Sequence, residues 1–288
     1  MRKIYVMGTV MALMLMGCEQ SVTNDADQEA MQGEKEICFR CEGDFGNASF
    51  TRASLAADGK EMTDVWVMDY MGGQLVQQKH QAATDEDFGQ PSLTLAYGQH
   101  HIYLVASRGE GPTLSTTDHK ITWAKPLDTF YKDYVITVNG GTSATQNVEM
   151  ARAVTRLKLT VDDMVPADIA TVTVTPGKWY YGLDYLTGEP TEAKTNEPRV
   201  MSIPATMAGT TGELNVNVFG FSGATEWTTD IAVVAKNSTN DVIGSASIAG
   251  APFKVNRVTN YNGNLFVNAG GFSLTLMGAW DSEYTGTW

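Results

Sequence analysis

Apolar and polar side chains alternate along most of this chain with a period of two residues. Residues 155–161 (TRLKLTV), 170–175 (ATVTVT) and 213–219 (ELNVNVF) show the pattern most clearly. Successive side chains of a β-strand point to opposite faces of its sheet, so each run predicts a strand with one buried face. Further runs of this kind cover residues 64–70, 92–96, 101–106, 134–138, 230–235, 242–248, 257–267 and 272–278.

Turn residues separate these runs. A Gly72-Gly73 pair follows residues 64–70 and precedes another short apolar run, which predicts a hairpin. Helical periodicity is almost absent, and only residues 82–88 and 113–129 are expected to hold short helices. Short strands at this spacing, with Gly, Asn and Pro between them, predict an all-β protein of antiparallel β-sandwiches.

The chain length and one change in composition predict two domains. After removal of a 17-residue leader, 271 of the 288 residues remain (288 − 17), which suits two domains of ordinary size. A small, polar stretch at 142–145 gives way to a basic cluster at 152–158. We therefore predict an N-terminal β-sandwich domain over residues 37–150 and a C-terminal one over residues 151–288.

The N-terminus has the parts of a lipoprotein export signal. Arg2 and Lys3 precede an apolar run at 4–16, which is shorter than the ~20 residues needed to cross a membrane. A small residue then precedes Cys18, whose thiol is the group that receives the diacylglyceryl unit and its palmitate-like acyl chains. We expect residues 1–17 to be removed as a signal peptide and Cys18 to anchor the protein through lipid. The alternatives are an uncleaved anchor or an ordinary signal peptide with a chance cysteine.

The charge of the chain is strongly acidic. Asp and Glu outnumber Lys and Arg by 33 to 20, and the net charge is −13. This balance argues against nucleic acid as a partner and against binding an anionic membrane through charge. Acidic residues gather at 19–36, where Lys35 is the only base. Because such a stretch cannot bury enough apolar surface to fold, we predict a flexible acidic tether over residues 18–36.

Residue types that carry chemistry are present, but not in catalytic patterns. The chain has no Gly-x-Ser-x-Gly or His-Glu-x-x-His motif, so we predict no catalytic residues, no metal and no cofactor, and we do not expect an enzyme. Cys38 and Cys41 form a Cys-x-x-Cys, but residues three apart on a strand face opposite sides about 10 Å apart, too far for a disulfide. His100 and His101 are adjacent on a predicted strand and therefore face opposite ways.

Two clusters leave alternatives open. Residues 162–163 are a pair of aspartates that could bind calcium weakly, although a solvated turn is favoured. An aromatic group could form a platform for sugar rings, although packing inside the fold is favoured. Its members are Trp179, Tyr180, Tyr181 and Tyr185.

Four regions of the chain resemble the fimbrillins, the subunits of type V pili built by lipoprotein export. They are the lipidation motif with its polar tether, residues 37–40 with 51–53 and 65–70 (ICFR, TRA and VWVMDY), residues 151–157 (ARAVTRL), and residues 256–261 (NRVTNY) with Trp280 and Trp288. The order and spacing of these regions carry the resemblance, since none of them is specific alone.

The resemblance implies two tandem transthyretin-like β-sandwiches and a mechanism of assembly. A trypsin-like protease would cut between Arg52 and Ala53 and release the first strand. Until then, Ile37, Phe39 and Cys41 would fill the core of the N-terminal domain. A strand from a neighbouring subunit would then take the vacant place. The partners implied are other pilus subunits and, through Cys18, the outer membrane; the implied location is the cell surface and then the fimbrium, with roles in adhesion or biofilm.

Several points stay open at the level of sequence. Arg152-Ala153 is a second Arg-Ala pair, and the donated strand is either in residues 272–288 or in the new N-terminus after Arg52. The subunit is a stalk subunit or an uncleaved anchor subunit. The alternative function is a surface glycan-binding lipoprotein that uses the aromatic group around Trp179; a hydrolase is disfavoured.

Overall fold

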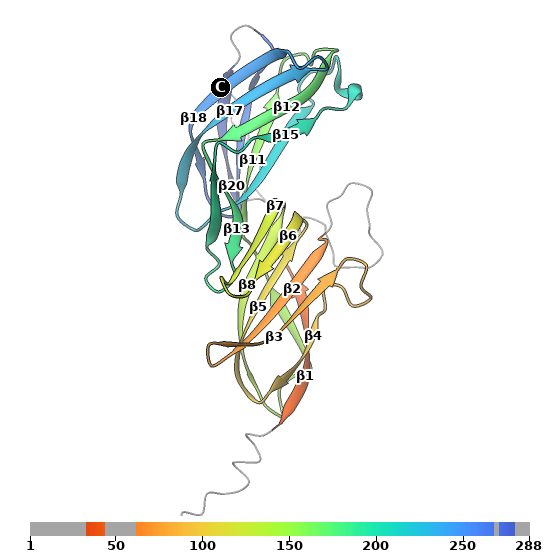
Figure 1. Cartoon of the computed structure of the whole chain (residues 1–288), viewed down its shortest axis with the longest axis vertical. Helices are drawn as coiled ribbons and strands as arrows, with labels where there is room; N and C mark the ends of the chain where they lie inside the picture. The colour runs from red at the N-terminus through yellow and green to blue at the C-terminus, as the bar shows by residue number, and fades with distance from the viewer. Residues whose placement is uncertain (1–32, 44–61, 268–270, 280–288) are drawn as a thin grey trace, which may run out of the picture.

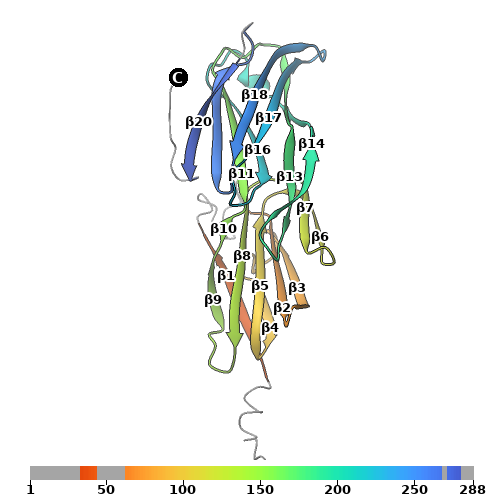
Figure 2. The same cartoon turned by 90° about the vertical axis from the view of Figure 1, so that its left-hand side faces the viewer.

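A computed structural model describes residues 33–43, 62–267 and 271–279. In this part of the chain the structure is all β, apart from a single 3-10 turn at η1 (Ala205–Met207). Figures 1 and 2 show an elongated molecule in which two β-sandwiches are stacked end to end. The prediction of tandem β-sandwiches is therefore confirmed. No helix among the described residues has the length and apolar character to span a membrane.

The N-terminal sandwich consists of two sheets that enclose one core. The first sheet has the order β4 (Ser92–Ala96), β1 (Glu34–Glu42), β9 (Thr145–Glu149). The second has the order β10 (Ala151–Arg152), β8 (Thr129–Val138), β5 (Gly98–Ser107), β2 (Asp64–Met71), β3 (Gln74–Ala82). Every strand of the first sheet contributes buried apolar side chains to the core, as do β2, β5 and β8 of the second.

The C-terminal sandwich repeats this plan with two four-stranded sheets. One has the order β16 (Leu214–Phe221), β11 (Val154–Val161), β19 (Arg257–Asn264), β20 (Gly271–Ala279). The other has the order β15 (Arg199–Ser202), β12 (Ile169–Pro176), β17 (Trp227–Asn237), β18 (Val242–Phe253). The strands β15, β16, β18 and β20 are thus the edge strands of this sandwich.

A fifth sheet joins the two halves. Its order is β14 (Pro190–Thr195), β13 (Lys178–Asp184), β7 (Lys120–Lys125), β6 (Glu110–Ser115), so each half supplies one hairpin. A separate apolar core lies at this junction and combines side chains of β2, β5 and β7 with side chains of β13 and β16. As a result, β2 is buried on both faces: Val67 lies in the N-terminal core and Met68 in the junction.

The predicted strand positions and the predicted hairpin agree with the structure. The turn between β2 and β3 is Gly72-Gly73, with φ of 58° and 79°, the left-handed values that a two-residue hairpin loop requires. The predicted helix at 113–129 is wrong, because these residues form most of the β6–β7 hairpin and the start of β8. The predicted helix at 82–88 is also wrong, since these residues form turns after β3.

The sequence predicts antiparallel sheets, but two of the strand pairs in the structure are parallel. β1 pairs parallel with β9, and β11 pairs parallel with β19. Parallel neighbours need long connections between them, and here the intervening chain builds the rest of each sandwich. Each parallel pair therefore joins segments that are far apart in the sequence.

The segment between the predicted domains is fixed in place by Arg152. Its guanidinium donates hydrogen bonds to both carboxylate oxygens of Asp128, at 2.7 and 3.2 Å, and to the side chain of Asn256 at 3.2 Å. The group also lies over the Phe130 ring, with 4.7 Å between the guanidinium carbon and the ring centre. Because Asp128 and Asn256 come from opposite halves, this buried cation ties the two halves together.

The two adjacent histidines face opposite ways, as predicted. His100 is buried, with Nδ1 at 2.6 Å from an Asp69 carboxylate oxygen and Nε2 donating to the carbonyl of Ala96 at 2.9 Å. His101 is partly exposed, 3.3 Å from Asp133. Among the described residues no group of three or more side chains is placed to hold a metal ion.

Candidate strand-exchange site around strand β1

Strand β1 is the central strand of the smaller N-terminal sheet. It pairs antiparallel with β4 along Glu34–Cys38 and parallel with β9 along Cys38–Glu42. Further backbone bonds continue the pairing: Phe39 donates to Pro91 at 2.9 Å and Cys41 donates to Gly89 at 3.0 Å. Without β1 the backbone groups of β4 and β9 that face it would lose their partners.

The alternating side chains of β1 enter the N-terminal core. Ile37 and Phe39 have no exposed surface, and Cys41 is 5% exposed. The Phe39 ring meets Tyr134 of the opposite sheet edge-on, with 6.2 Å between ring centres. Burying an Ile or Phe side chain fully stabilises a fold by roughly 1.5–3 kcal/mol each, so these two contribute about 3–6 kcal/mol. The structure thus places all three predicted core fillers inside the sandwich.

The outer end of β1 is tied to the loop between β8 and β9. The Lys35 ammonium donates to the carbonyl of Gly140 at 3.0 Å and also to the carbonyl of Thr142. β1 begins at Glu34, three residues before the predicted start of the N-terminal domain at residue 37, because its pairing with β4 extends that far. The predicted acidic tether therefore overlaps the strand at its end.

The two cysteines of β1 are free thiols on opposite faces, as strand geometry predicts. Burial, with a smaller effect of Cys38, raises the pKa of Cys41 to about 12. A thiol with this pKa stays protonated at neutral pH and is a poor nucleophile. Cys38 is partly exposed and its sulfur contacts the carbonyl of Gln90 at 3.7 Å. Cys41 therefore behaves as a core side chain.

The predicted processing site lies in the connection after β1. Cys18, Arg52 and Ala53 are all outside the described residues. The described chain stops at residue 43 after β1 and resumes at residue 62, before β2 in the opposite sheet. The connection over residues 44–61 joins β1 covalently to β2. A cut there would leave β1 held only by noncovalent contacts.

The second Arg-Ala pair has a different environment. Arg152 is buried and paired with Asp128, while the Ala153 amide donates to the carbonyl of Thr129 at 2.9 Å. The carbonyl of Ala153 accepts a hydrogen bond from Ser222. A protease needs an extended, accessible segment, so the folded protein protects this bond.

Three members of the aromatic group around Trp179 are packed inside the protein, and the fourth, Tyr180, is half-buried. Trp179 is 1% exposed, Tyr181 and Tyr185 are also buried, and the Trp179 indole donates to the carbonyl of Phe219 at 2.8 Å. The Tyr185 hydroxyl lies 3.0 Å from that of Tyr70, across the junction between the halves. These rings therefore do not form the exposed sugar platform considered above; they hold the C-terminal core and the junction.

The aspartates at 162–163 belong to a loop that one of them holds. The Asp163 carboxylate accepts hydrogen bonds from the amides of Leu265, Phe266 and Val267, at 2.7–3.1 Å. Burial raises the pKa of the Asp162 carboxyl, and the charge of Asp163 adds to this shift. With its oxygens occupied by backbone amides, Asp163 acts as a loop anchor.

Strand β20 is a further element that matters for strand exchange. It is an edge strand of the C-terminal sandwich and pairs antiparallel with β19. Its sequence places Phe272, Leu274 and Leu276 at alternate positions, the same spacing as the buried side chains of β1. Figures 1 and 2 show β20 in the upper half of the elongated molecule and β1 in the lower half. The alternation in residues 272–278 was the sequence signal for this strand.

Comparison with solved structures shows a shared fold. A "putative cell adhesion protein" from Bacteroides uniformis matches over 85% of this chain and 97% of its own, with 12% identity and a TM-score of 0.52. A "putative adhesin" from Bacteroides ovatus matches over 89% and 95%, with 14% identity and a TM-score of 0.49. The tip fimbrial protein Mfa3 from Porphyromonas gingivalis, truncated at its C-terminus, matches over 85% and 99%, with 11% identity and a TM-score of 0.46.

At 12% identity, the match to the Bacteroides uniformis protein establishes a shared fold and nothing further. No protein-family model matches the chain, and no curated protein matches it significantly by sequence.

Proposed function

We propose that this protein is a structural subunit of a surface pilus, exported as a lipoprotein on Cys18 and polymerised by exchange of strand β1. Cleavage between Arg52 and Ala53 releases the lipid and β1 together. It is a binding and structural protein rather than an enzyme. The observation that carries this proposal is the position of β1. It is a central strand whose side chains fill the core, and the connection over residues 44–61 joins it to β2.

The physical basis is the gap that β1 leaves. β4 and β9 would flank an apolar groove with unpaired backbone groups on both sides, and such a groove gains stability from any strand with the right alternation. A strand that runs antiparallel to β4 and parallel to β9 restores the hydrogen bonds, and its alternate side chains replace Ile37 and Phe39. Because donor and acceptor are different surfaces, the contact repeats head to tail and grows into a filament.

The donated strand in this proposal is β20. Phe272, Leu274 and Leu276 match the spacing of the β1 core residues, and β20 lies at a sheet edge, where pairing with one neighbour holds it. β20 and the groove belong to different halves of the elongated molecule (Figures 1 and 2), which suits head-to-tail growth. The new N-terminus after Arg52 is the competing donor.

Limited trypsin digestion of the soluble Cys18→Ser precursor tests the processing step. Arg52 and Lys60 are the basic residues in the connection at 44–61. We expect an early cut after Arg52, loss of the β1 fragment and formation of multimers, observed by mass spectrometry and size-exclusion chromatography. The Arg52→Ala, Lys60→Ala double variant, which leaves trypsin no basic residue in the connection, should stay monomeric under the same digestion, whereas the matched Lys60→Ala single variant should assemble as the parent does.

Each remaining outcome of this digestion has a meaning. A precursor that is cut after Arg52 yet stays monomeric counts against a stalk subunit. A precursor that trypsin leaves intact at Arg52 favours the anchor subunit, which keeps its lipid and holds the base of the fibre. The surface glycan-binding alternative lacks its aromatic platform, since Trp179 and Tyr181 are buried.

Truncation tests the donor. A precursor that ends at residue 270 lacks β20 but retains β1 and the connection after it. We expect trypsin to cut this variant after Arg52 as in the parent, and we expect the product to remain monomeric. The truncated chain should still be incorporated as a terminal subunit when mixed with the cleaved parent, because its groove is intact. Assembly of the truncated chain alone would instead identify the new N-terminus as the donor.

A further inference from the structure

A cavity of about 270 Å³ lies where the two halves of the molecule meet. Three segments line it: the end of β7 with the residues that follow it, the start of β15, and the middle of β16. β15 and β16 are edge strands of the two C-terminal sheets, so the cavity opens at the side of the sandwich that no further strand covers among the described residues. Ligand pockets form preferentially at such junctions between domains.

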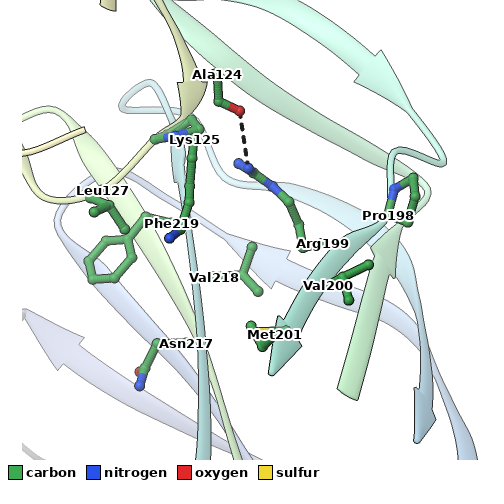
Figure 3. A pocket seen from close by; sticks show the side chains of 11 residues that line it. Ala124, Lys125, Leu127, Pro198, Arg199, Val200, Met201, Asn217, Val218 and Phe219 are labelled. Carbon is green, nitrogen blue, oxygen red and sulfur yellow. Dashed lines mark hydrogen bonds between the residues drawn. The ribbon is translucent and has the colours of Figure 1, made fainter. Parts of the chain in front are cut away.

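The most constrained polar group of the cavity is the Arg199 guanidinium. Figure 3 shows this side chain reaching from β15 to the carbonyl of Ala124, a contact of 3.4 Å, at the long end for a hydrogen bond. One face of the guanidinium is stacked on Tyr181, 4.3 Å from the ring centre. Its Nε is buried and has no hydrogen-bond partner in the described structure. Burial lowers the pKa of Arg199, which reflects the cost of keeping this cation away from water.

The charged side chains in the lining of the cavity are both cationic, while Glu110 and Glu197 lie near Arg199 outside that lining. The charged side chains that line it are Lys125 and Arg199, and no acidic side chain of the described residues is among its lining. Lys125 already contacts the Glu110 carboxylate at 2.6 Å. Arg199, in contrast, forms no ion pair with a carboxylate in the described chain. A guanidinium with five donors and one long hydrogen bond can accept a planar, two-oxygen anion.

The remaining walls of the cavity are mostly apolar, so they favour a ligand with an apolar body. Val218 and Phe219 line the cavity from β16, and Val200 and Met201 line it from β15. Val200 is largely exposed, so an apolar group bound in the cavity would remove part of its surface from water. A volume near the lower end of the usual range for ligand pockets suits one ring or a short chain.

We propose that this cavity binds a small organic carboxylate with an apolar body. The carboxylate lies on the Arg199 guanidinium, and the body rests against Val200, Met201 and Val218. The site is separate from the groove around β1 and does not depend on strand exchange.

Benzoate is the probe, and benzamide, which has nearly the same shape without the charge, is its matched control. On the uncleaved Cys18→Ser precursor we expect benzoate to bind with a Kd of about 1 mM by isothermal titration calorimetry. Benzamide should bind at least about tenfold more weakly, because a hydrogen bond to a charged group contributes roughly 1.5–3 kcal/mol. The methyl NMR signals of Val200 and Met201 should shift with benzoate.

Substitutions locate the anion. Arg199→Gln should weaken benzoate binding about tenfold or more, and Arg40→Gln, an exposed site on β1, should leave it unchanged. If Arg199→Gln fails to fold, Arg199→Lys, which keeps the charge but loses the two-point fork, should still weaken binding. Equal affinity for benzoate and benzamide, full binding by a folded Arg199 variant, or shifts confined to other parts of the protein would each overturn the proposal.

Discussion

Replacing Phe39 by Ala is expected to destabilise the N-terminal sandwich by about 3–5 kcal/mol, the usual cost of removing a buried phenylalanine from a core. Phe39 has no exposed surface, contacts Tyr134 and stands between the buried side chains of Ile37 and Cys41. The cavity left by Ala cannot collapse easily, because β1 is fixed by hydrogen bonds along both edges. The loss falls on β1, the strand that leaves the fold in the proposed exchange.

Alkylation of Cys41 measures this effect directly. In the folded protein Cys41 is buried and its pKa is raised to about 12, so it reacts when the sandwich opens. Labelling in increasing urea, followed by mass spectrometry, should show the Phe39→Ala variant opening about a hundredfold or more often than the parent. Arg40→Ala, an exposed neighbour on the same strand, should change the free energy by no more than about 0.5 kcal/mol.

Equal labelling of Cys41 in Phe39→Ala and Arg40→Ala would contradict the assignment of β1 as a core-filling strand. A variant of Phe39 in which Cys41 is alkylated faster should also form multimers faster after the cut at Arg52, because a weakly held β1 leaves the groove sooner. The proposal thus couples the stability of the subunit to its assembly through one side chain.

Strand positions in this fold were predictable from sequence because most strands have one buried and one exposed face. The period-two pattern of residues 155–161 and 213–219 corresponds to β11 and β16, and the alternation of Ile37, Phe39 and Cys41 corresponds to the buried face of β1. The Gly72-Gly73 turn was equally clear, since its left-handed backbone demands glycine.

The junction between the halves was not predictable in the same way. β7 and β13 pair although their partner residues are 60–64 positions apart in the sequence, and short-range alternation carries no information about such partners. Residues 113–129 lacked a clear alternating pattern because Ile121 and Trp123 are buried at the junction, while Thr113 and Ser115 belong to an edge strand. From the sequence alone, the aromatic residues around Trp179 could lie at the surface or in the core. Long-range packing places Trp179, Tyr181 and Tyr185 in the core.

The cavity at Arg199 had no sequence signal. Its lining comes from three separate segments, residues 124–127, 198–201 and 217–219, and Arg199 is flanked by Pro198 and Val200 without any motif. What marks the site is the environment of a half-buried guanidinium, whose Nε is buried without a partner among the described residues and which makes a single long hydrogen bond.

A covalent lock on β1 tests the central proposal, that assembly requires β1 to leave. Cys38 of β1 and Ser92 of β4 are direct partners across an antiparallel pair. Phe39 donates to Pro91, so the neighbouring pair Cys38 and Ser92 is of the kind without mutual hydrogen bonds, in which the Cα atoms are about 4.5 Å apart. That separation lies within the range that a disulfide accepts. The substitution Ser92→Cys therefore offers a bond to the native Cys38.

The measurement is multimer formation by trypsin-cut Cys18→Ser, Ser92→Cys protein before and after reduction, with Cys18→Ser, Ser92→Ala as the unlocked control. The proposal predicts that the oxidised protein is cut after Arg52, keeps β1 through the disulfide and stays monomeric, and that reductant then starts assembly to the level of the control. Multimers that form equally well from the cut, oxidised protein would show that assembly proceeds with β1 in place, and would contradict the proposal.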